Sequence, residues 1–273
     1  MAMKPSIAII TVVYNNYQVL KDFLASLKKQ QTDNFHLFIA DASSTKQQID
    51  TDDIPITVIH TENKGYAHGV NIGLKSAAAK GYTNYCVIND DVFFNENFTG
   101  LLNQTFQEHP QTIFGGKIYY APGYEYHKTH YREDQKGKVI WYAGGEVDWD
   151  HAVTRHIGVD AVDNETYVKP LETGFITGCF MCFDQQVLDK VGLWDKKYFL
   201  YYEDADYCER AKKMHIKLLY EPAIHIWHKN AQSTDGSGSS LHQKFQKHAQ
   251  LRFALKYAPL RTKLHIINNY LFS

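Results

Sequence analysis

The sequence predicts an α/β fold with a Rossmann-like, mostly parallel central sheet flanked by helices. Two observations predict this fold class. Apolar, β-rich runs alternate with segments whose apolar residues recur at helical spacing. Polar residues follow directly after each of these runs. The alternation is typical of βαβ units, in which the strands lie parallel. The polar residues suit the edge where open parallel sheets bind ligands.

The first half of the chain supplies most of the predicted strands. The run "SIAIITVVYN" ends at a polar turn, and Asn16 is a candidate N-cap for the helix that follows. "FHLFIAD" and "ITVIHTEN" are the second and third strands, and "NYCVIND" is the fourth. A helix over 66–80 precedes the fourth strand and ends at Gly81 in the C′ position. The first helix carries its apolar side on Val19, Leu20, Phe23, Leu24 and Leu27.

The second half is less regular. Residues 119–169 are rich in Tyr and Trp and are broken by Gly144-Gly145, which predicts irregular structure and short hairpins inserted on the sheet. A strand "FITGCFMCF", a helix over 184–191, a helix starting near Glu203 and a strand "KLLYEPAIHIWH" follow. We therefore expect one domain over 1–235, with a ligand-binding half at 1–118 and a second half at 119–235. A basic C-terminal helical segment over 236–273 completes the chain.

Composition and charge restrict the class of protein. The chain has 273 residues, of which 44% are hydrophobic and 22% charged, as in ordinary globular proteins. A formal net charge of −1 argues against a general nucleic-acid binder. Residues 236–273 contain six Lys or Arg and no Asp or Glu, so the body is acidic and the tail basic. We find no signal peptide and no apolar run near the length of a membrane span, and expect a cytoplasmic protein whose membrane contacts are peripheral.

The four cysteines indicate neither a disulfide framework nor a metal site. Cys179 and Cys182 form a C-x-x-C motif within the predicted strand "FITGCFMCF". Residues three apart on a strand face opposite sides, which is poor geometry for sharing a metal ion.

Adjacent carboxylates end the fourth predicted strand. Asp90 and Asp91 follow the apolar run "YCVI", with Asn89 before them. They form either a solvated turn or a site where a hard divalent cation is held by carboxylate and phosphate oxygens. Their position at the ligand edge of the sheet favours the cation site.

The segment "YYEDADYCERAKKM" is a second group of acids. Asp204 falls in the first helical turn, where the helix dipole stabilises its charge, and this favours a proton acceptor. Asp204 shares a face with Cys208 and Ala211, whereas Asp206 points roughly opposite. The alternative is that these acids only decorate a helix N-terminus.

Two histidines lie in the last predicted strand, "IHIWHKN". His225 and His228 are three residues apart and therefore face opposite ways. His228 ends the strand next to the Gly/Ser-rich loop "STDGSGSS", which favours a functional role over a structural one. The loop either folds over a bound donor or is a simple linker.

The ordered motifs resemble a family 2 glycosyltransferase of the GT-A fold, from the bacterial group that includes rhamnosyltransferases. The resemblance covers roughly residues 6–230. Its motifs are "TVVYNN", "DASS", "ENKGYAHGVNIGL", "INDDV", "ITGCFMCF", "GLWDKKYFLYYEDADYCERA" and "IWH".

The resemblance implies a role for each matching residue. Asp204 corresponds to the general base of the family's "ED" motif. Asp91 and His228 correspond to metal ligands, and Asn89 stands where the family has the first Asp of its DxD motif. Trp194, Tyr201 and Glu203, near the "ED" turn, are candidate acceptor contacts. The implied nucleotide and donor contacts are Thr11, Tyr14, Asn15, Asp41 (to the base), Asn63, Gly65, Asn71, Asn89 and Asp90.

The implied activity is inverting transfer of a sugar from a nucleotide-sugar donor, dependent on Mn²⁺ or Mg²⁺. The segments "IWYAGGEVDW" and "HIG" favour dTDP-rhamnose, while UDP-galactose, UDP-glucose and an N-acetylhexosamine donor stay open. The acceptor would be a saccharide or lipid-linked saccharide in synthesis of a bacterial capsule or cell-wall polysaccharide, at the inner face of the plasma membrane. A non-catalytic nucleotide-sugar-binding subunit is an alternative. A sugar-1-phosphate nucleotidyltransferase is disfavoured, because no Gly-rich basic loop follows the first strand.

The tail has two interpretations. Leu251, Ala254, Leu255 and Ala258 share one helical side, with Lys247, Arg252 and Lys256 elsewhere. Such a helix either lies on a membrane surface or packs on the protein.

Overall fold

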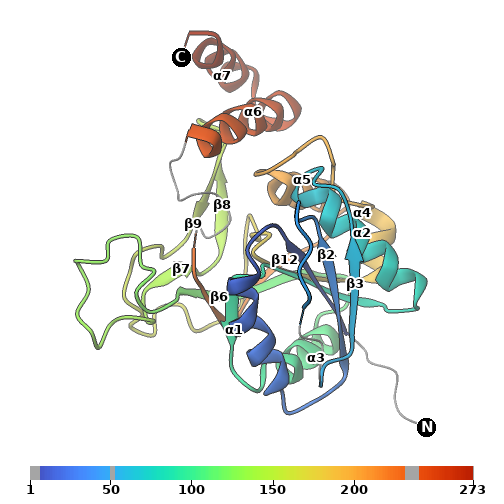
Figure 1. Cartoon of the computed structure of the whole chain (residues 1–273). Coiled ribbons are helices and arrows are strands. Elements are labelled where there is room, and N and C mark those ends of the chain that lie inside the picture. The colour runs from blue at the N-terminus through green and yellow to red at the C-terminus, as the bar shows by residue number, and fades with distance from the viewer. Residues whose placement is uncertain (1–6, 50–52, 231–239, 273) are drawn as a thin grey trace.

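A computed structural model describes residues 7–49, 53–230 and 240–272 and shows a mixed α/β fold around one large sheet (Figure 1). The described strands of the sheet follow the order β10-β12-β6-β11-β4-β1-β2-β3, with β5 paired to β12 and β7 to β6. Helices α1 and α3 cover one face, and α2, α4 and α5 cover the other. The mostly parallel, Rossmann-like sheet predicted from the sequence is confirmed.

The nucleotide-side half follows the predicted order closely. Strand β1 (Ile7–Val13) lies parallel to β2 (Phe35–Asp41) and to β4 (Asn84–Ile88), and β2 lies parallel to β3 (Ile56–His60). Helix α1 (Tyr17–Lys28) buries all five of its predicted apolar residues. Helix α2 (Tyr66–Ala79) ends before Gly81, which has φ +83° as expected for a C′ glycine.

The second half adds strands of both directions. Strands β5 (Val92–Phe94) and β6 (Ile113–Tyr120) flank helix α3 (Phe98–Glu108) in sequence, and the later strand β12 (Leu218–His228) is parallel to β6. Strand β7 (Ile140–Tyr142) and the hairpin of β8 (Gly145–Asp148) with β9 (Val153–His156) lie in the insert predicted over 119–169, and β10 (Leu171–Glu172) follows it. The remaining helices here are α4 (Gln185–Val191) and α5 (Glu203–Lys213).

Strand β11 (Phe180–Asp184) differs from the prediction and matters for the site. It is shorter than the predicted strand and lies antiparallel between β4 and β6. Because its direction is reversed, the residues just before it, including Gly178 and Cys179, lie at the edge where β4 ends. The predicted strand is interrupted there by a turn, in which the Phe180 amide donates to the Thr177 carbonyl at 3.2 Å and the Cys179 amide donates to the Thr177 hydroxyl at 3.3 Å.

The C-terminal helices α6 (Ser240–Tyr257) and α7 (Leu260–Phe272) stack at the end of the molecule that carries α5 (Figure 1). Phe253 of α6 is fully buried and stacks on Trp149 of the β8–β9 hairpin, with ring centroids 5.6 Å apart. Ala254 and Ala258 are buried, but Leu255 is 48% exposed, so the apolar side predicted for α6 is only partly correct. Helix α6 therefore packs on the protein through Phe253 and the adjacent residues, which is one of the two interpretations of the tail that the sequence allowed.

Close approach of β6 and β12 depends on a glycine. A Cβ atom added at Gly116 of β6 would lie 2.1 Å from the backbone oxygen of Ile224, at the irregularity in β12 between Glu221 and His225. Backbone atoms cannot move away as a flexible side chain could, so even an alanine is too large here.

Gly116→Ala should therefore lower the free energy of unfolding by about 1–3 kcal/mol through overpacking. Gly100→Ala is the matched control. No described heavy atom lies within 4 Å of the added methyl group, and Gly100 lies inside α3, so this change should raise stability by about 0.5–1 kcal/mol. Urea denaturation of both variants checks the pair, and equal effects would contradict the packing argument.

Candidate active site

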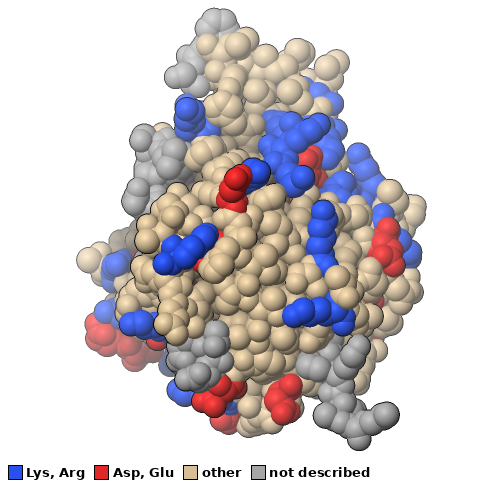
Figure 2. Space-filling view, turned by 45° about the vertical axis from the view of Figure 1, so that its right-hand side comes forward, with Lys and Arg blue, Asp and Glu red and all other residues tan. Residues whose placement is uncertain are grey.

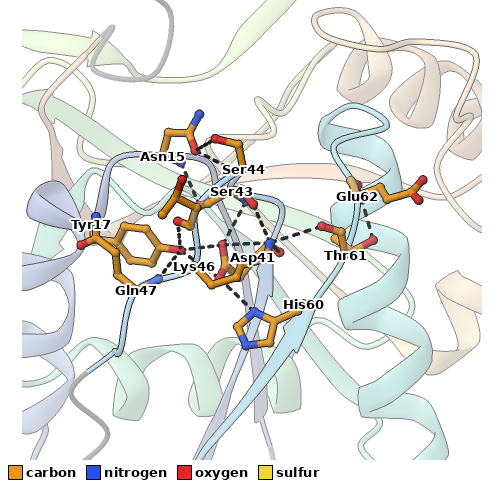
Figure 3. A network of polar contacts seen from close by, with 11 residues as sticks. Asn15, Tyr17, Asp41, Ser43, Ser44, Lys46, Gln47, His60, Thr61 and Glu62 are labelled. Atoms are coloured by element: carbon orange, nitrogen blue, oxygen red, sulfur yellow. Dashed lines mark hydrogen bonds and ion pairs between the residues drawn. The ribbon is translucent and has the colours of Figure 1, made fainter.

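The carboxyl ends of β1, β2 and β3 converge on Asp41, as Figure 3 shows. The Asp41 side chain is fully buried and accepts hydrogen bonds from the Tyr17 hydroxyl at 3.0 and 3.1 Å and from the Ser43 amide at 3.0 Å. The ring of His60 lies 3.0 Å from its other oxygen. Burial acts to raise the pKa of Asp41, but these partners outweigh it and lower the pKa. The carboxylate therefore stays ionised and organises this edge.

Lys46 and Asn15 close the same loop. The Lys46 ammonium donates to the backbone oxygens of Asp41 and Ser43, each at 2.7 Å. Asn15 has φ +57° and accepts bonds from the amide and hydroxyl of Ser44 at 2.9 and 3.0 Å. The chain between the first two strands is thus held in one conformation by its own polar groups.

Other residues predicted on this side differ in accessibility. Tyr14 is 42% exposed, whereas Thr11 is fully buried and its hydroxyl has no hydrogen-bond partner among the described residues. Asn63 is exposed, and its side-chain oxygen accepts a bond from the Gly65 amide at 3.2 Å. Contacts of these residues with a nucleotide stay predictions.

Gly65 joins the nucleotide side to the catalytic side. It has φ +95°, and a Cβ atom there would lie 2.3 Å from the backbone oxygen of Phe199. The next residue, Tyr66, donates its backbone N–H to the same oxygen at 2.8 Å. Only glycine allows both the left-handed conformation and this close approach.

The carboxyl end of β4 places Asp91 against His228, which ends β12. The Asp91 Oδ1 atom lies 3.1 Å from His228 Nε2, and both residues are buried. Burial acts to raise the pKa of Asp91, but His228 outweighs it and lowers the pKa. Burial and the Asp91 charge raise the pKa of Asp90 well above its usual value. The pKa values of the two adjacent aspartates are thus shifted in opposite directions.

The Asp91–His228 pair has donor atoms suited to a divalent cation. His228 Nδ1 is buried without a hydrogen-bond partner in the described part of the chain, whereas Asp91 Oδ1 is already paired with His228 Nε2. Carboxylate oxygen and imidazole nitrogen together suit Mn²⁺. Within residues 7–49, 53–230 and 240–272, no group of three or more His, Cys, Asp or Glu is arranged to hold a metal. A cation here would need further ligands from the substrate or water.

Asp204 and this pair meet at one short segment before β11. Gly178 donates its amide to Asp204 Oδ2 at 2.8 Å, and its carbonyl accepts a bond from the Tyr66 hydroxyl at 3.2 Å. The Cys179 thiol, next in sequence, has its pKa raised mainly by burial and also interacts with His228, Asp91 and Asp204. The predicted acid–base and metal residues therefore lie on the same edge of the molecule.

Glu203 and Asp204 both have raised pKa values. Burial and the charge of Asp204 raise the pKa of Glu203 well above its usual value. Burial also raises the pKa of Asp204, while the backbone amides of Gly178 and Ala205 offset part of the rise. Asp204 is the less buried of the two and accepts two amide hydrogen bonds, at 2.8 Å each. Of this pair, Asp204 is suited to accept a proton.

A strained turn leads into Asp204. Tyr201 and Tyr202 have φ +72° and +65°, a left-handed conformation that bulky residues rarely adopt. The Tyr202 ring packs 5.3 Å from the ring of Phe253 in α6, and its hydroxyl donates to the Ala152 carbonyl at 3.2 Å. The C-terminal helix therefore helps to hold the turn that positions Glu203 and Asp204.

Asp206 anchors α6 to the same helix. Its carboxylate is fully buried and receives bonds from Lys256 at 2.5 Å, from the Tyr257 hydroxyl at 2.8 Å and from Arg210 at 2.9 Å. Burial acts to raise the pKa of Asp206, but these three partners outweigh it and lower the pKa. Asp206 does not decorate a solvated helix end; it fixes the C-terminal helix to α5.

Trp194 and Asn71 are buried behind the site. Asn71 donates to the Trp194 carbonyl at 2.8 Å and accepts from the Trp194 amide at 2.9 Å. The indole is 2% exposed and packs between the rings of Tyr66 and Tyr207. The expectation that Trp194 offers a face to an acceptor sugar is wrong for this conformation, because neighbouring rings cover it. A direct contact of Asn71 with a donor stays a prediction.

Sequence reasoning missed several residues that build this site. Tyr17 and His60 could have been found, because they follow or end strands that reach the ligand edge. Tyr66, Gly178 and Lys256 gave no such signal, since their partners lie far away in sequence. The loop "STDGSGSS" (233–240) falls almost wholly outside the described residues.

The fold and the site define an α/β scaffold with an acidic edge at the ends of parallel strands. Residues 8–192 match the family profile described as Glycosyl transferase family 2. The chain belongs to this family. A search of curated protein sequences finds no match.

Solved structures with the same GT-A fold support the assignment of the scaffold. GalNAc-T7 with UDP, GalNAc and Mn²⁺ has a TM-score of 0.69 at 14% identity, covering 93% of this chain and 48% of that chain. This protein therefore spans about half the length of that relative. The mannosyltransferase PcManGT from Pyrobaculum calidifontis, with GDP-Man and Mn²⁺, has a TM-score of 0.56 at 13% identity, with coverages of 100% and 71%. TarS 1-349 of S. aureus has 0.54 at 15% identity, with coverages of 98% and 71%.

Lys256→Gln should lower stability by about 1–2 kcal/mol near neutral pH, because Asp206 stays buried with one cation fewer. The folded-state pKa of Asp206 is lowered, so the stabilisation from its partners is present above the ordinary Asp range and is lost as pH falls through the folded value. The stability difference between wild type and variant should therefore shrink in acid.

Urea midpoints measured from neutral to acidic pH test this expectation. Lys244→Gln is the matched control, because Lys244 is an exposed lysine on the same helix. An equal loss in both variants, or a difference independent of pH, would contradict the proposed anchor.

Proposed function

We propose that this protein is an inverting, metal-dependent glycosyltransferase that transfers a sugar from a nucleotide-sugar donor to a saccharide or lipid-linked saccharide acceptor. The pathway we propose is synthesis of a bacterial cell-surface polysaccharide. One observation carries the proposal. The Gly178–Cys179 segment brings the Asp204 carboxylate to the same edge as the Asp91–His228 pair.

Asp204 would act as the general base. It would accept the proton of the acceptor hydroxyl as that oxygen attacks the anomeric carbon, while the bond from that carbon to the diphosphate breaks. Attack from the face opposite the leaving group inverts the anomeric centre. Glu203 beside it, whose pKa is raised by burial and by the Asp204 charge, would donate a hydrogen bond to the acceptor in its protonated form.

Asp91 and His228 would hold Mn²⁺ or Mg²⁺ together with oxygens of the donor diphosphate. When bound, the cation offsets the charge of the leaving nucleoside diphosphate. Asp90 and half-buried Asn89 lie beside this pair, and the Tyr66 hydroxyl donates to the Asn89 oxygen at 3.0 Å. This bond fixes the side chain next to the proposed diphosphate site.

The nucleotide would lie at the other end of the same edge, over β1 and β2. Asp41 is the proposed base contact, and a ligand there would compete with Tyr17 or His60 for its oxygens. Tyr14 and Asn15 would line the pocket. We favour dTDP-rhamnose as the donor. UDP-galactose, UDP-glucose or an N-acetylhexosamine donor is the alternative, which the neighbours solved with UDP support.

Asp204→Asn should reduce turnover at least about a hundredfold, because an amide cannot accept the proton, while donor affinity is kept. Nucleotide release during turnover and donor titration by calorimetry measure the two quantities. Asp189→Asn, which changes an exposed aspartate of α4, is the matched control. Near-normal turnover in the Asp204 variant would remove Asp204 from the role.

Metal dependence is tested by thermal shift with a panel of nucleotide sugars, with Mn²⁺ or with a chelator. We expect one donor to stabilise the protein only with metal, and both Asp91→Asn and His228→Gln to abolish that metal-dependent part. His225→Gln is the control on the same strand, since His225 faces the other way and contacts Asn95. An unchanged metal-dependent shift in the first two variants would refute the proposed metal site.

A further inference from the structure

Helix α7 exposes an apolar stripe that no described residue covers. Leu260, Leu264 and Leu271 are 73%, 61% and 68% exposed. At 3.6 residues per turn these three positions fall within roughly 40° of arc, so they form one line along the helix. We call this line the leucine stripe. Scattered exposed leucines need no explanation, but a continuous line of them marks a contact surface.

The opposite side of α7 is fixed to the protein. Thr262 and Ile266 are buried, and the Thr262 hydroxyl donates to the Trp149 carbonyl at 2.8 Å. The Tyr270 hydroxyl lies 2.8 Å from His248 of α6. Because these contacts fix the opposite side of α7 to the protein, the leucine stripe faces away from the protein.

Positive charge surrounds the leucine stripe. Arg261 is exposed and Lys263 is half-buried on α7, and Lys244 is exposed on α6. The sequence from 236 to 273 contains no Asp or Glu. Figure 2 shows the upper end of the molecule, which carries these helices, as mainly tan with blue, and red lies among the blue just below it. The charge of the surface therefore suits an anionic partner.

We propose that the leucine stripe and its cations dock the protein on an anionic lipid bilayer. Leucines would enter the interface between headgroups and acyl chains, and Arg261 and Lys263 would contact anionic headgroups. A second copy of the chain fits less well, because pairing two copies of this face would bring like charges together. Within the described residues, no helix is long and apolar enough to cross a membrane, so the contact would be a surface one.

Docking would place the catalytic turn next to the bilayer. Helix α6 stacks between α7 and α5 (Figure 1), and its Phe253 packs against Tyr202 beside Asp204. An acceptor carried on a lipid would reach this turn without leaving the membrane surface. This preference for a lipid-linked acceptor rests on the proposed function, whereas the lipid contact itself does not.

Vesicle co-sedimentation of the full chain, without any donor, tests the docking. The wild type should pellet with phosphatidylcholine vesicles that contain phosphatidylglycerol and stay in solution with phosphatidylcholine alone. Leu264→Gln/Leu271→Gln should lower partitioning at least about tenfold. Arg261→Gln/Lys263→Gln should lower it and weaken its salt dependence. Val168→Gln/Met214→Gln, at positions 51% and 55% exposed, is the matched control and should bind like wild type.

Circular dichroism and thermal unfolding check that each variant folds. If the leucine double variant does not fold, the single variant Leu260→Gln is used in its place. Equal pelleting of wild type and leucine variants would overturn the proposal. A second outcome would also overturn it: the wild type does not bind lipid, and light scattering shows a dimer for the wild type but a monomer for the leucine variant. Donor binding measured on the same proteins tests the proposed function separately, so either proposal can fail alone.

Discussion

Gly178 donates its backbone N–H to Asp204, and the candidate site depends on this bond. It fixes a carboxylate from the start of α5 against the segment that carries Cys179, which in turn lies beside Asp91 and His228. The bond also offsets part of the rise in pKa that burial imposes on Asp204. Backbone dipoles, rather than a neighbouring cation, oppose the effect of burial on this carboxyl.

The site shows how a protein places several carboxyls close together. The pKa values of Asp90 and Glu203 are each raised by burial and by the charge of the adjacent aspartate. Asp91 and Asp41 keep their charges through partners that are themselves fixed, His228 and Tyr17 among them. Each of these two charged carboxylates therefore has its own stabilising partner. These partners offset the repulsion between neighbouring acids that the sequence suggests.

The sequence was sufficient to predict the sheet, because β1 to β4 and their helices have clear apolar periods. Acidic side chains at strand ends were also predictable, since parallel strands bring their carboxyl ends to one edge. Trp194 was misplaced because its environment is set by Asn71 and Tyr66, more than a hundred residues earlier. The sequence also did not predict the short length of β11 or the burial of Asp206, and the reason is the same. Both depend on contacts between distant segments, which a local pattern does not encode.

The contact between Gly65 and Phe199 has a consequence for recombining such proteins. A glycine without a side chain lies against a backbone oxygen of the other half, so the loops at 63–66 and 198–202 form one unit although they are far apart in sequence. A hybrid that takes its first 118 residues from one homologue and the remainder from another would separate this matched pair. A hybrid designed to exchange donor preference between homologues would therefore have to take both loops from the same homologue.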